Sequence, residues 1–313
     1  MHFLGIIWNP DETIFSLGPL QIKYYNLLWV VSFALGWYLM KKIFFNEKKT
    51  VEQLDSLFIY TLVATMLGAR LGHVFFYDWA YYSEHLLEIL LPIRDTGDGY
   101  EFTGFTGLAS HGAAIGVIIG MYLFTRKFKE FKMLWILDRI VVPFAIGAFC
   151  VRLGNFFNSE INGKVTDENF IFATKFVRDS DDMHPSKALG ITKEKTINAA
   201  YDALATKAEF SEYLAQIPYR HPAQLYEGIA YIFVFLILYF LYWKTNKKDK
   251  PGYLFGLFLV LLWTIRFFVE YVKKSQGGFE ESLGLLSTGQ WLSIPFVIIG
   301  LYFMFRPVNG VRA

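Results

Sequence analysis

The stretch PAQLYEGIAYIFVFLILYFLYW, residues 222–243, decides the class of this protein. Its only formal charge is Glu227, and the residues that follow are almost all aliphatic or aromatic. A helix needs ~20 mostly apolar residues to cross a hydrocarbon core of ~30 Å. The stretch therefore predicts a helix that spans a membrane.

The composition of the whole chain points the same way. Of its 313 residues, 54% are hydrophobic and 19% are charged, whereas the charged share of soluble domains is ~25%. The net charge of +2 gives no argument for a nucleic-acid partner. The single cysteine, Cys150, excludes an internal disulfide and a cysteine metal cluster. No metal-ligand, nucleotide-binding or serine-hydrolase motif is present, so we expect no metal and no cofactor.

The apolar pattern recurs along the chain. We predict seven spanning helices, over residues 22–43, 54–77, 108–125, 134–154, 222–243, 252–271 and 289–306. The predicted fold is an all-α polytopic membrane protein in which residues 1–313 form a single integral membrane domain. Residues 155–221 are expected to form an insertion between the fourth and fifth helices. Within it, TINAAYDALATKAEFSEYLAQI predicts one or two surface helices.

Basic residues predict the orientation. The short loops over residues 41–49, 126–132 and 244–250 are rich in lysine and arginine, whereas the connection 78–106 carries only Arg94. Cytoplasmic loops hold the excess of basic residues in membrane proteins. We therefore expect the N-terminus and the 155–221 insertion outside and the C-terminus in the cytoplasm. The apolar patch HLLEILLPI within 78–106 is too short to span and predicts an interfacial helix.

With this orientation, polar side chains gather at the outer ends of six predicted spans: Tyr25, Arg70, His111, Arg152, Asn155, Gln224, Glu227, Arg266 and Glu270. Charges within a membrane cost several kcal/mol unless paired or hydrated, so they usually mark a site or a pathway. Arg266 and Glu270 could instead form only an intrahelical ion pair, and Arg70 could simply extend to the headgroups. Agreement among six helices favours a shared site.

The residue types suggest an anionic lipid as the ligand. A planar guanidinium binds phosphate through two donors at once, and three spans each supply an arginine. The third helix adds a positive N-terminal end, with Ser110 as the expected N-cap. The same dipole is expected to keep the neighbouring His111 neutral and able to accept a proton.

The residues alone leave two classes of function open, group transfer and transport. A transporter or flippase of an anionic lipid predicts polar residues that continue to the cytoplasmic side, together with inverted repeats. The inner halves of the predicted spans carry few polar residues, and no internal symmetry is evident.

Five motifs in order carry a resemblance to a known family: GARLG (68–72), SHGAAIG (110–116), RLGNFFNSEING (152–163), RHPAQLYE (220–227) and RFFVE (266–270). Together they resemble the prolipoprotein diacylglyceryl transferases of bacterial inner membranes, along nearly the whole chain. The family usually has HGGLIG where this chain has Ala113 and Ala114, and NGE where it has Ser159. Both departures exchange one small residue for another. The segment 164–219 follows no family pattern.

The resemblance implies transfer of the sn-1,2-diacylglyceryl group from phosphatidylglycerol to the lipobox cysteine thiol of a prolipoprotein. The products would be a thioether-linked lipid and glycerol-1-phosphate. It also implies a multi-pass protein of the bacterial cytoplasmic membrane, with an active site that faces the outer leaflet. The reaction occurs at an sp³ carbon, so it needs a thiolate and a stabilised phosphate leaving group.

The resemblance also implies roles for the polar residues. Arg152 and Arg266 are expected to clamp the phosphate, and Asn155 and Asn158 to orient glycerol or phosphate oxygens. Glu160 and Glu270 would hold the arginines and bind headgroup hydroxyls, with Gly163 in a tight turn with close backbone approach and Arg70 as a further lipid contact. Either His111 or Tyr25 would orient or deprotonate the thiol. The remaining three residues would contact and position these lipid-binding side chains: Gln224, Tyr226 and Glu227.

Overall fold

The computed structural model describes residues 5–17, 20–91, 93–97, 99–102, 107, 109–274 and 286–307. The chain divides into two compact units. The first comprises Met1–Tyr38 and Asp138–Ala313, and the second comprises Leu39–Leu137. The predicted single integral domain stays a prediction.

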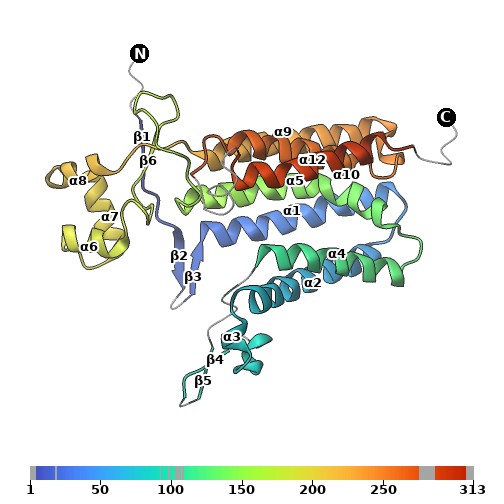
Figure 1. The fold of residues 1–313 in the computed structure, drawn as a ribbon, viewed down its shortest axis with the longest axis horizontal. Coiled ribbons are helices and arrows are strands. Elements are labelled where there is room, and N and C mark those ends of the chain that lie inside the picture. Colours follow the sequence, from blue (N-terminus) through green and yellow to red (C-terminus); the bar gives the residue numbers. More distant parts are fainter. Residues whose placement is uncertain are drawn as a thin grey trace. The chain divides into compact units, whose positions relative to one another are not determined.

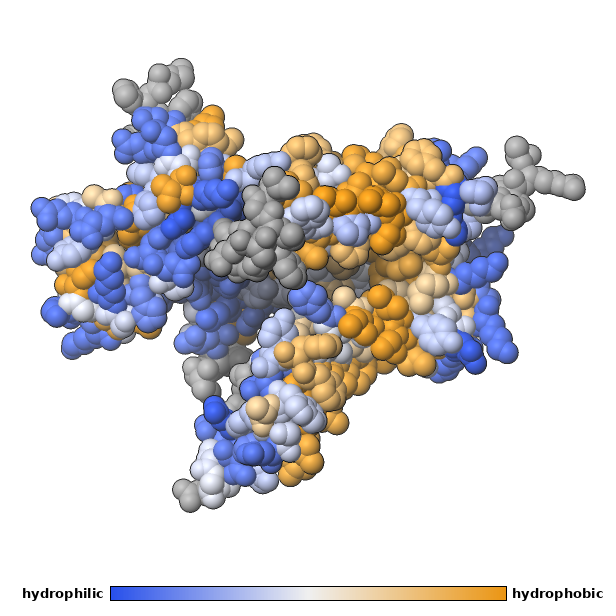
Figure 2. Space-filling model, in the orientation of Figure 1, coloured by the Kyte–Doolittle hydropathy of each residue, from blue (hydrophilic) through white to orange (hydrophobic). Residues whose placement is uncertain are grey.

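Long apolar helices dominate the first unit (Figure 1), which contains most of α1 (Tyr24–Asn46) and α5 (Met133–Phe157) and the whole of α9 (Ala223–Lys244), α10 (Tyr253–Val269) and α12 (Thr288–Phe305). The helices α10 and α12 pack closely, because Gly256 and Gly300 let their backbones approach and Trp263 stacks on Phe296 with ring centroids 4.2 Å apart. The surface over α9 and α12 is mainly apolar in Figure 2, as expected for helices that face lipid.

A buried carboxylate joins α5 to the start of α10. Asp138 is fully buried, and its oxygens accept hydrogen bonds from the backbone N–H groups of Gly252 (2.6 Å) and Phe255 (2.9 Å). These groups belong to the first turn of α10, whose N–H groups have no partner within the helix. Asp138 thus caps α10 from a neighbouring helix, which fixes where α10 begins.

The segment between α5 and α9 folds outside the long helices. It contains β6 (Thr174–Phe176), α6 (Pro185–Thr192), α7 (Ile197–Thr206), the 3-10 turn η2 (Ala208–Phe210) and α8 (Ser211–Gln216). Its helices close over a small core that includes Met183, Tyr201 and Leu204. This segment has a largely hydrophilic surface in Figure 2. The predicted surface helices are confirmed as α7 and α8.

The N-terminal residues attach to this segment. Strand β1 (Ile6–Trp8) pairs in parallel with β6, and β2 (Thr13–Leu17) pairs antiparallel with β3 (Leu20–Lys23) before α1 begins. The indole of Trp8 donates a hydrogen bond to the carbonyl of Phe156, 2.9 Å away, at the end of α5.

The second unit is built on α2 (Val51–Tyr77) and α4 (Ser110–Lys127). A Cβ on Gly68 would overlap the backbone of Gly112 and Gly116 on α4, so the two helices touch backbone to backbone, as the G-x-x-x-G spacing indicates. The remaining elements connect them: α3 (Trp79–Tyr82), η1 (Leu86–Ile89), β4 (Ile93–Asp95) and β5 (Tyr100–Phe102). The turn η1 falls within the patch predicted as an interfacial helix.

Helices occur at all seven predicted positions, and in the part of the chain that the structure describes five of them are long and apolar enough to cross a membrane: α1, α2, α5, α9 and α12. The protein is thus a mostly helical, multi-pass membrane protein, and spanning by α4 and α10 stays a prediction. The all-α prediction missed the three small two-stranded sheets found among the described residues, because strands of three to five residues give too short a pattern. The expected N-cap was also wrong, since Ser110 is the first residue of α4 and Ala109 is its N-cap.

Candidate active site

One carboxylate joins two arginines from different helices. Glu227, in the first turns of α9, lies 2.6 Å from Nε of Arg152 on α5 and 3.7 Å from Nη1 of Arg266 on α10. Its side chain is 3% exposed, and the hydroxyl of Tyr231 donates a hydrogen bond of 2.9 Å to it. Helix α9 begins where α5 and α10 end, so three helices bring these groups to one level.

A second carboxylate and a lysine extend this group. The Glu270 side chain lies 3.6 Å from Nη2 of Arg266 and 3.4 Å from Nζ of Lys273, and it accepts a hydrogen bond from the hydroxyl of Ser287. We call Arg152, Glu227, Arg266, Glu270 and Lys273 the arginine cluster. Its three cations and two carboxylates leave a formal charge of +1, which favours an anionic ligand.

Lys273 had no role in the sequence analysis. Its side chain is only 6% exposed, and burial, followed by the charge of Arg266, lowers the pKa of its ammonium group. The signal that could have found it is spacing: Lys273 follows Glu270 by three residues, at a distance where helical or turn side chains meet.

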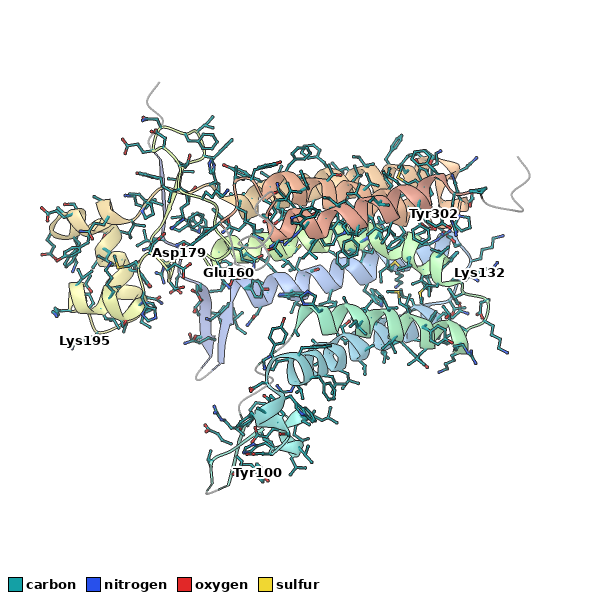
Figure 3. The ribbon with its side chains drawn as sticks, in the orientation of Figure 1. Tyr100, Lys132, Glu160, Asp179, Lys195 and Tyr302 are labelled. Carbon is teal, nitrogen blue, oxygen red and sulfur yellow. The ribbon has the colours of Figure 1, made fainter. Side chains whose placement is uncertain are left out.

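Amide side chains connect the cluster to Glu160. Nη1 of Arg152 donates a hydrogen bond of 3.3 Å to Oδ1 of Asn155. Nδ2 of Asn155 in turn donates a hydrogen bond of 2.7 Å to Glu160. Asn158 donates a longer one, of 3.3 Å, to the same oxygen. Glu160 is exposed and lies just beyond the end of α5, beside the loop that carries Asp179 (Figure 3). Two amides, rather than an arginine, therefore hold the Glu160 carboxylate.

The loop that follows α5 has an unusual backbone. Ser159 and Ile161 have φ of 53° and 61°, a left-handed conformation that is costly for a β-branched residue. Buried amides hold it: Asn162 donates to the carbonyl of Ser159 and to Asp179, and Gln224 donates to the carbonyl of Glu160 and to Asn162. Gln224, predicted as a support residue, contacts this loop directly.

Gly163 leaves the loop in an extended conformation. It pairs with Lys273 in an antiparallel bridge, so the predicted tight turn is wrong. The predicted close approach is confirmed, because a Cβ there would lie 2.5 Å from the carbonyl oxygen of His221 and 2.7 Å from that of Val272. Only glycine fits between these two segments, and the bridge places Lys273 beside the loop.

The model of the family described as prolipoprotein diacylglyceryl transferase matches residues 12–306 of this chain. The chain belongs to this family. A relative in Bacteroides fragilis, named phosphatidylglycerol–prolipoprotein diacylglyceryl transferase, is 41% identical over 96% of this chain and 95% of its own length. Relatives with the same name in Chloroherpeton thalassium and Tolumonas auensis are 37% and 36% identical, each over at least 96% of both chains. The resemblance drawn from the five motifs is confirmed.

The two predicted tyrosines of the site, Tyr25 and Tyr226, contact different parts of the first unit. Tyr25, in the first turn of α1, packs on Gly154, where an added Cβ would lie 2.6 Å from its ring. It thus sits beside the last turn of α5. Tyr226 instead lies 3.3 Å from the ring of His221, outside the arginine cluster.

The other two predicted residues of the transferase belong to the second unit. Arg70 is 5% exposed, and its guanidinium donates to the backbone carbonyls of Ile89, at 2.9 Å, and Glu88. It therefore ties η1 to α2. His111 is the second residue of α4 and is exposed. Their parts in lipid binding or proton transfer stay predictions.

Proposed function

We propose that this chain transfers the diacylglyceryl group of phosphatidylglycerol to the lipobox cysteine of a prolipoprotein, in the cytoplasmic membrane of a bacterium and at its outer leaflet. Family membership over residues 12–306 and the names of the full-length relatives support this reaction. The observation that carries the assignment of its site is the pairing of Arg152 and Arg266 on Glu227. Nothing in the described chain favours transport over transfer.

The arginine cluster is the proposed site for the phosphate. Arg266 is the most accessible cation, with 26% of its side chain exposed, and its two ion pairs of 3.6 and 3.7 Å are longer than hydrogen bonds. Its donors can therefore turn to a phosphate. Arg152 is held more tightly, at 2.6 Å from Glu227. The fixed carboxylate keeps both guanidinium groups in place, so little reorganisation is needed when negative charge develops.

The headgroup glycerol is proposed to contact Glu160. This carboxylate is exposed and oriented by Asn155 and Asn158, so it can accept hydrogen bonds from hydroxyl groups. A carboxylate directly against the phosphate would repel it. Glu160 is instead hydrogen-bonded by neutral amides and lies beside the cationic cluster. The headgroup hydroxyls and the phosphate are therefore bound by different residues.

The chemical step is a displacement at carbon. The thiolate sulfur attacks the diacylglycerol carbon that bears the phosphate ester, a C–S bond forms, and the C–O bond breaks. The bonding electrons leave with glycerol-1-phosphate, whose charge the cations of the cluster stabilise. The thiol proton passes to a base, for which Tyr25 and His111 both stay candidates. A free thiol has a pKa of ~8.5, so a base or a positive field raises the reactive fraction.

The reaction is tested with purified protein, phosphatidylglycerol vesicles and a lipobox peptide, by mass spectrometry of the peptide. We expect a mass gain of one diacylglyceryl group on the cysteine and its loss in Arg152→Ala. Absence of product with the wild type would overturn the proposed function.

The geometry of the phosphate contact is tested with Arg266→Lys. Lysine keeps the charge but loses the planar pair of donors, so we expect kcat/KM to fall by ~100-fold. Arg306→Lys is the matched control, because Arg306 lies at the far end of α12 and contacts the carbonyl of Pro251. An unchanged rate in Arg266→Lys would remove Arg266 from the clamp.

A further inference from the structure

We propose that a polar cavity beside Glu160 binds the polypeptide segment that follows the acceptor cysteine of the substrate. This inference rests on the proposed function and deepens it, because it assigns a place to the second substrate. The arginine cluster explains how a lipid is held, but it offers no place for a polypeptide.

The cavity has a volume of about 800 Å³ and lies wholly within the first unit. The β2–β3 hairpin with the residues before it, the strained loop after α5, the loop that carries Asp179 and the start of α7 form most of its lining, and Pro185 and Lys274 complete it. This volume falls in the range of ~300–1,000 Å³ that is typical of ligand sites. It is large enough for several residues of an extended peptide.

The cavity and the catalytic region share a wall. Asn158, Ser159 and Glu160 line the cavity, and Asn158 and Glu160 belong to the amide-held carboxylate next to Arg152. A molecule bound in the cavity therefore reaches the position where the headgroup is proposed to lie. This adjacency is what a two-substrate transfer requires, since the acceptor sulfur must contact the lipid while its chain leads away.

Two buried polar atoms at this wall lack a partner. Among the described residues, Oγ of Ser159 and Oδ1 of Asn158 are buried and accept no hydrogen bond, and Ser159 is only 3% exposed. A buried polar group without a partner costs about 1–3 kcal/mol, so such groups are rare in folded proteins. The amide oxygen is an acceptor, and a hydroxyl can accept as well. Both oxygens are enclosed by protein, so they add to the polar character of the wall without being exposed in the cavity.

The charge of the cavity favours a peptide over a second lipid. Its lining includes five carboxylates and three cations, a formal charge of −2: Asp11, Glu12, Glu160, Asp179 and Asp181 against Lys23, Arg178 and Lys274. An anionic phospholipid would be repelled, and acyl chains would find few apolar contacts. An exported precursor has its apolar signal segment before the processing site, and the chain that follows is polar. Neutral polar or basic residues directly after the cysteine fit this lining best.

The test compares two acceptor peptides with the same lipobox. The short peptide ends at the cysteine as an amide, and the long one continues with Ser-Asn-Lys-Ser. Both are assayed with wild type and with Ser180→Trp, which narrows the cavity from an exposed position in its lining. Ser211→Trp is the matched control, because Ser211 is also exposed and begins α8 away from the cavity lining.

We expect the long peptide to have a KM at least about fivefold below that of the short peptide in the wild type and in Ser211→Trp. In Ser180→Trp this advantage should disappear, while a Tm equal to that of the wild type shows that the variant is folded. Equal KM values for the two peptides in the wild type, or a retained advantage in Ser180→Trp, would overturn the cavity proposal. Failure of the wild type to modify either peptide would instead overturn the proposed function.

A cross-linking experiment tests the location without relying on turnover. A long peptide with serine in place of the acceptor cysteine carries a photoreactive residue three positions later. We expect cross-links to peptides that contain Arg178–Asp181 or Thr196–Asn198, with loss of these products in Ser180→Trp. Cross-links found only on the long helices would place the segment elsewhere and refute the proposal.

Discussion

Glu227 shows how a single residue organises the site. It is buried at 3% exposure, and without its partners a carboxylate at this depth would be strongly unfavourable. Arg152, Arg266 and Tyr231 all contact it. Because both arginines share one anchor, a change at Glu227 affects both halves of the proposed phosphate clamp at once.

Replacing Glu227 by glutamine should therefore abolish most activity. Glu227→Gln keeps the shape but removes the charge that orients both guanidinium groups, and we expect kcat/KM to fall by at least ~100-fold. Tyr231→Phe, which leaves both ion pairs in place, should lose ~10-fold or less. Initial rates with phosphatidylglycerol and a lipobox peptide measure both effects. A Glu227→Gln enzyme with half the wild-type rate would show that the shared anchor is dispensable.

The charge of Lys273 is expected to make the reaction rate depend on pH. Burial and the nearby Arg266 lower the pKa of its ammonium group, so the neutral form becomes populated at a lower pH than for a free lysine of pKa ~10.4. As the pH rises through this lowered pKa, the cluster loses one positive charge. Arginine stays protonated throughout.

The rate of Lys273→Arg relative to wild type should consequently increase between neutral and alkaline pH. Using this ratio removes the separate effect of thiol ionisation, which both enzymes share. Lys273→Met should be impaired at every pH. A ratio that is flat up to the alkaline limit of stability would exclude a role for the Lys273 charge.

At the scale of elements, buried polar contacts fix where helices begin and how they meet. Asp138 on α5 accepts hydrogen bonds from the first turn of α10, which ends at the arginine cluster with Arg266. The position of Arg266 thus depends on a contact at the opposite end of its helix. Removing the cap should loosen this helix and leave backbone N–H groups unpaired.

We expect Asp138→Ala to lower the free energy of unfolding by about 1–3 kcal/mol, with a measurable drop in Tm in detergent. Asp249→Ala serves as the control, because Asp249 lies exposed in the nearby turn η3 (Asn246–Asp249). Melting curves followed by intrinsic fluorescence provide the measurement. Equal Tm values for the two variants would show that α10 needs no cap from α5.

At the scale of the whole molecule, the orientation in the membrane stays a prediction from the basic loops. It places the segment with α6 and α7 outside and the loops that hold Lys132 and Lys247 in the cytoplasm. The single cysteine simplifies a test, because Cys150 is buried and can be replaced.

In a Cys150→Ala background, Lys195→Cys should react with a membrane-impermeant maleimide in intact spheroplasts. Lys132→Cys and Lys247→Cys should react only after permeabilisation. All three lysines are exposed (Lys132 and Lys195 are labelled in Figure 3), so a failure to react reports the membrane and not burial. Labelling of Lys247→Cys in intact spheroplasts would reverse the predicted topology.

Sequence patterns predicted the helices better than the contacts. Apolar runs placed helices at all seven positions, and the i, i+4 spacing of Arg266 and Glu270 predicted a pair that lies at 3.6 Å. Glu227 was predicted only to position other residues, whereas it forms ion pairs with both arginines. The left-handed backbone of Ile161 had no signal, because β-branched residues rarely adopt it.

Apolar length and ordered motifs are local properties of the chain, and they were enough to identify a multi-pass membrane protein of the transferase family. The tertiary structure alone decided which carboxylate anchors the arginines, that Lys273 joins them, and that a polar cavity opens beside Glu160. These contacts depend on the rotation and depth of helices that lie far apart in the sequence. One residue turns a helix by about 100°, so no local pattern specifies which side chains meet.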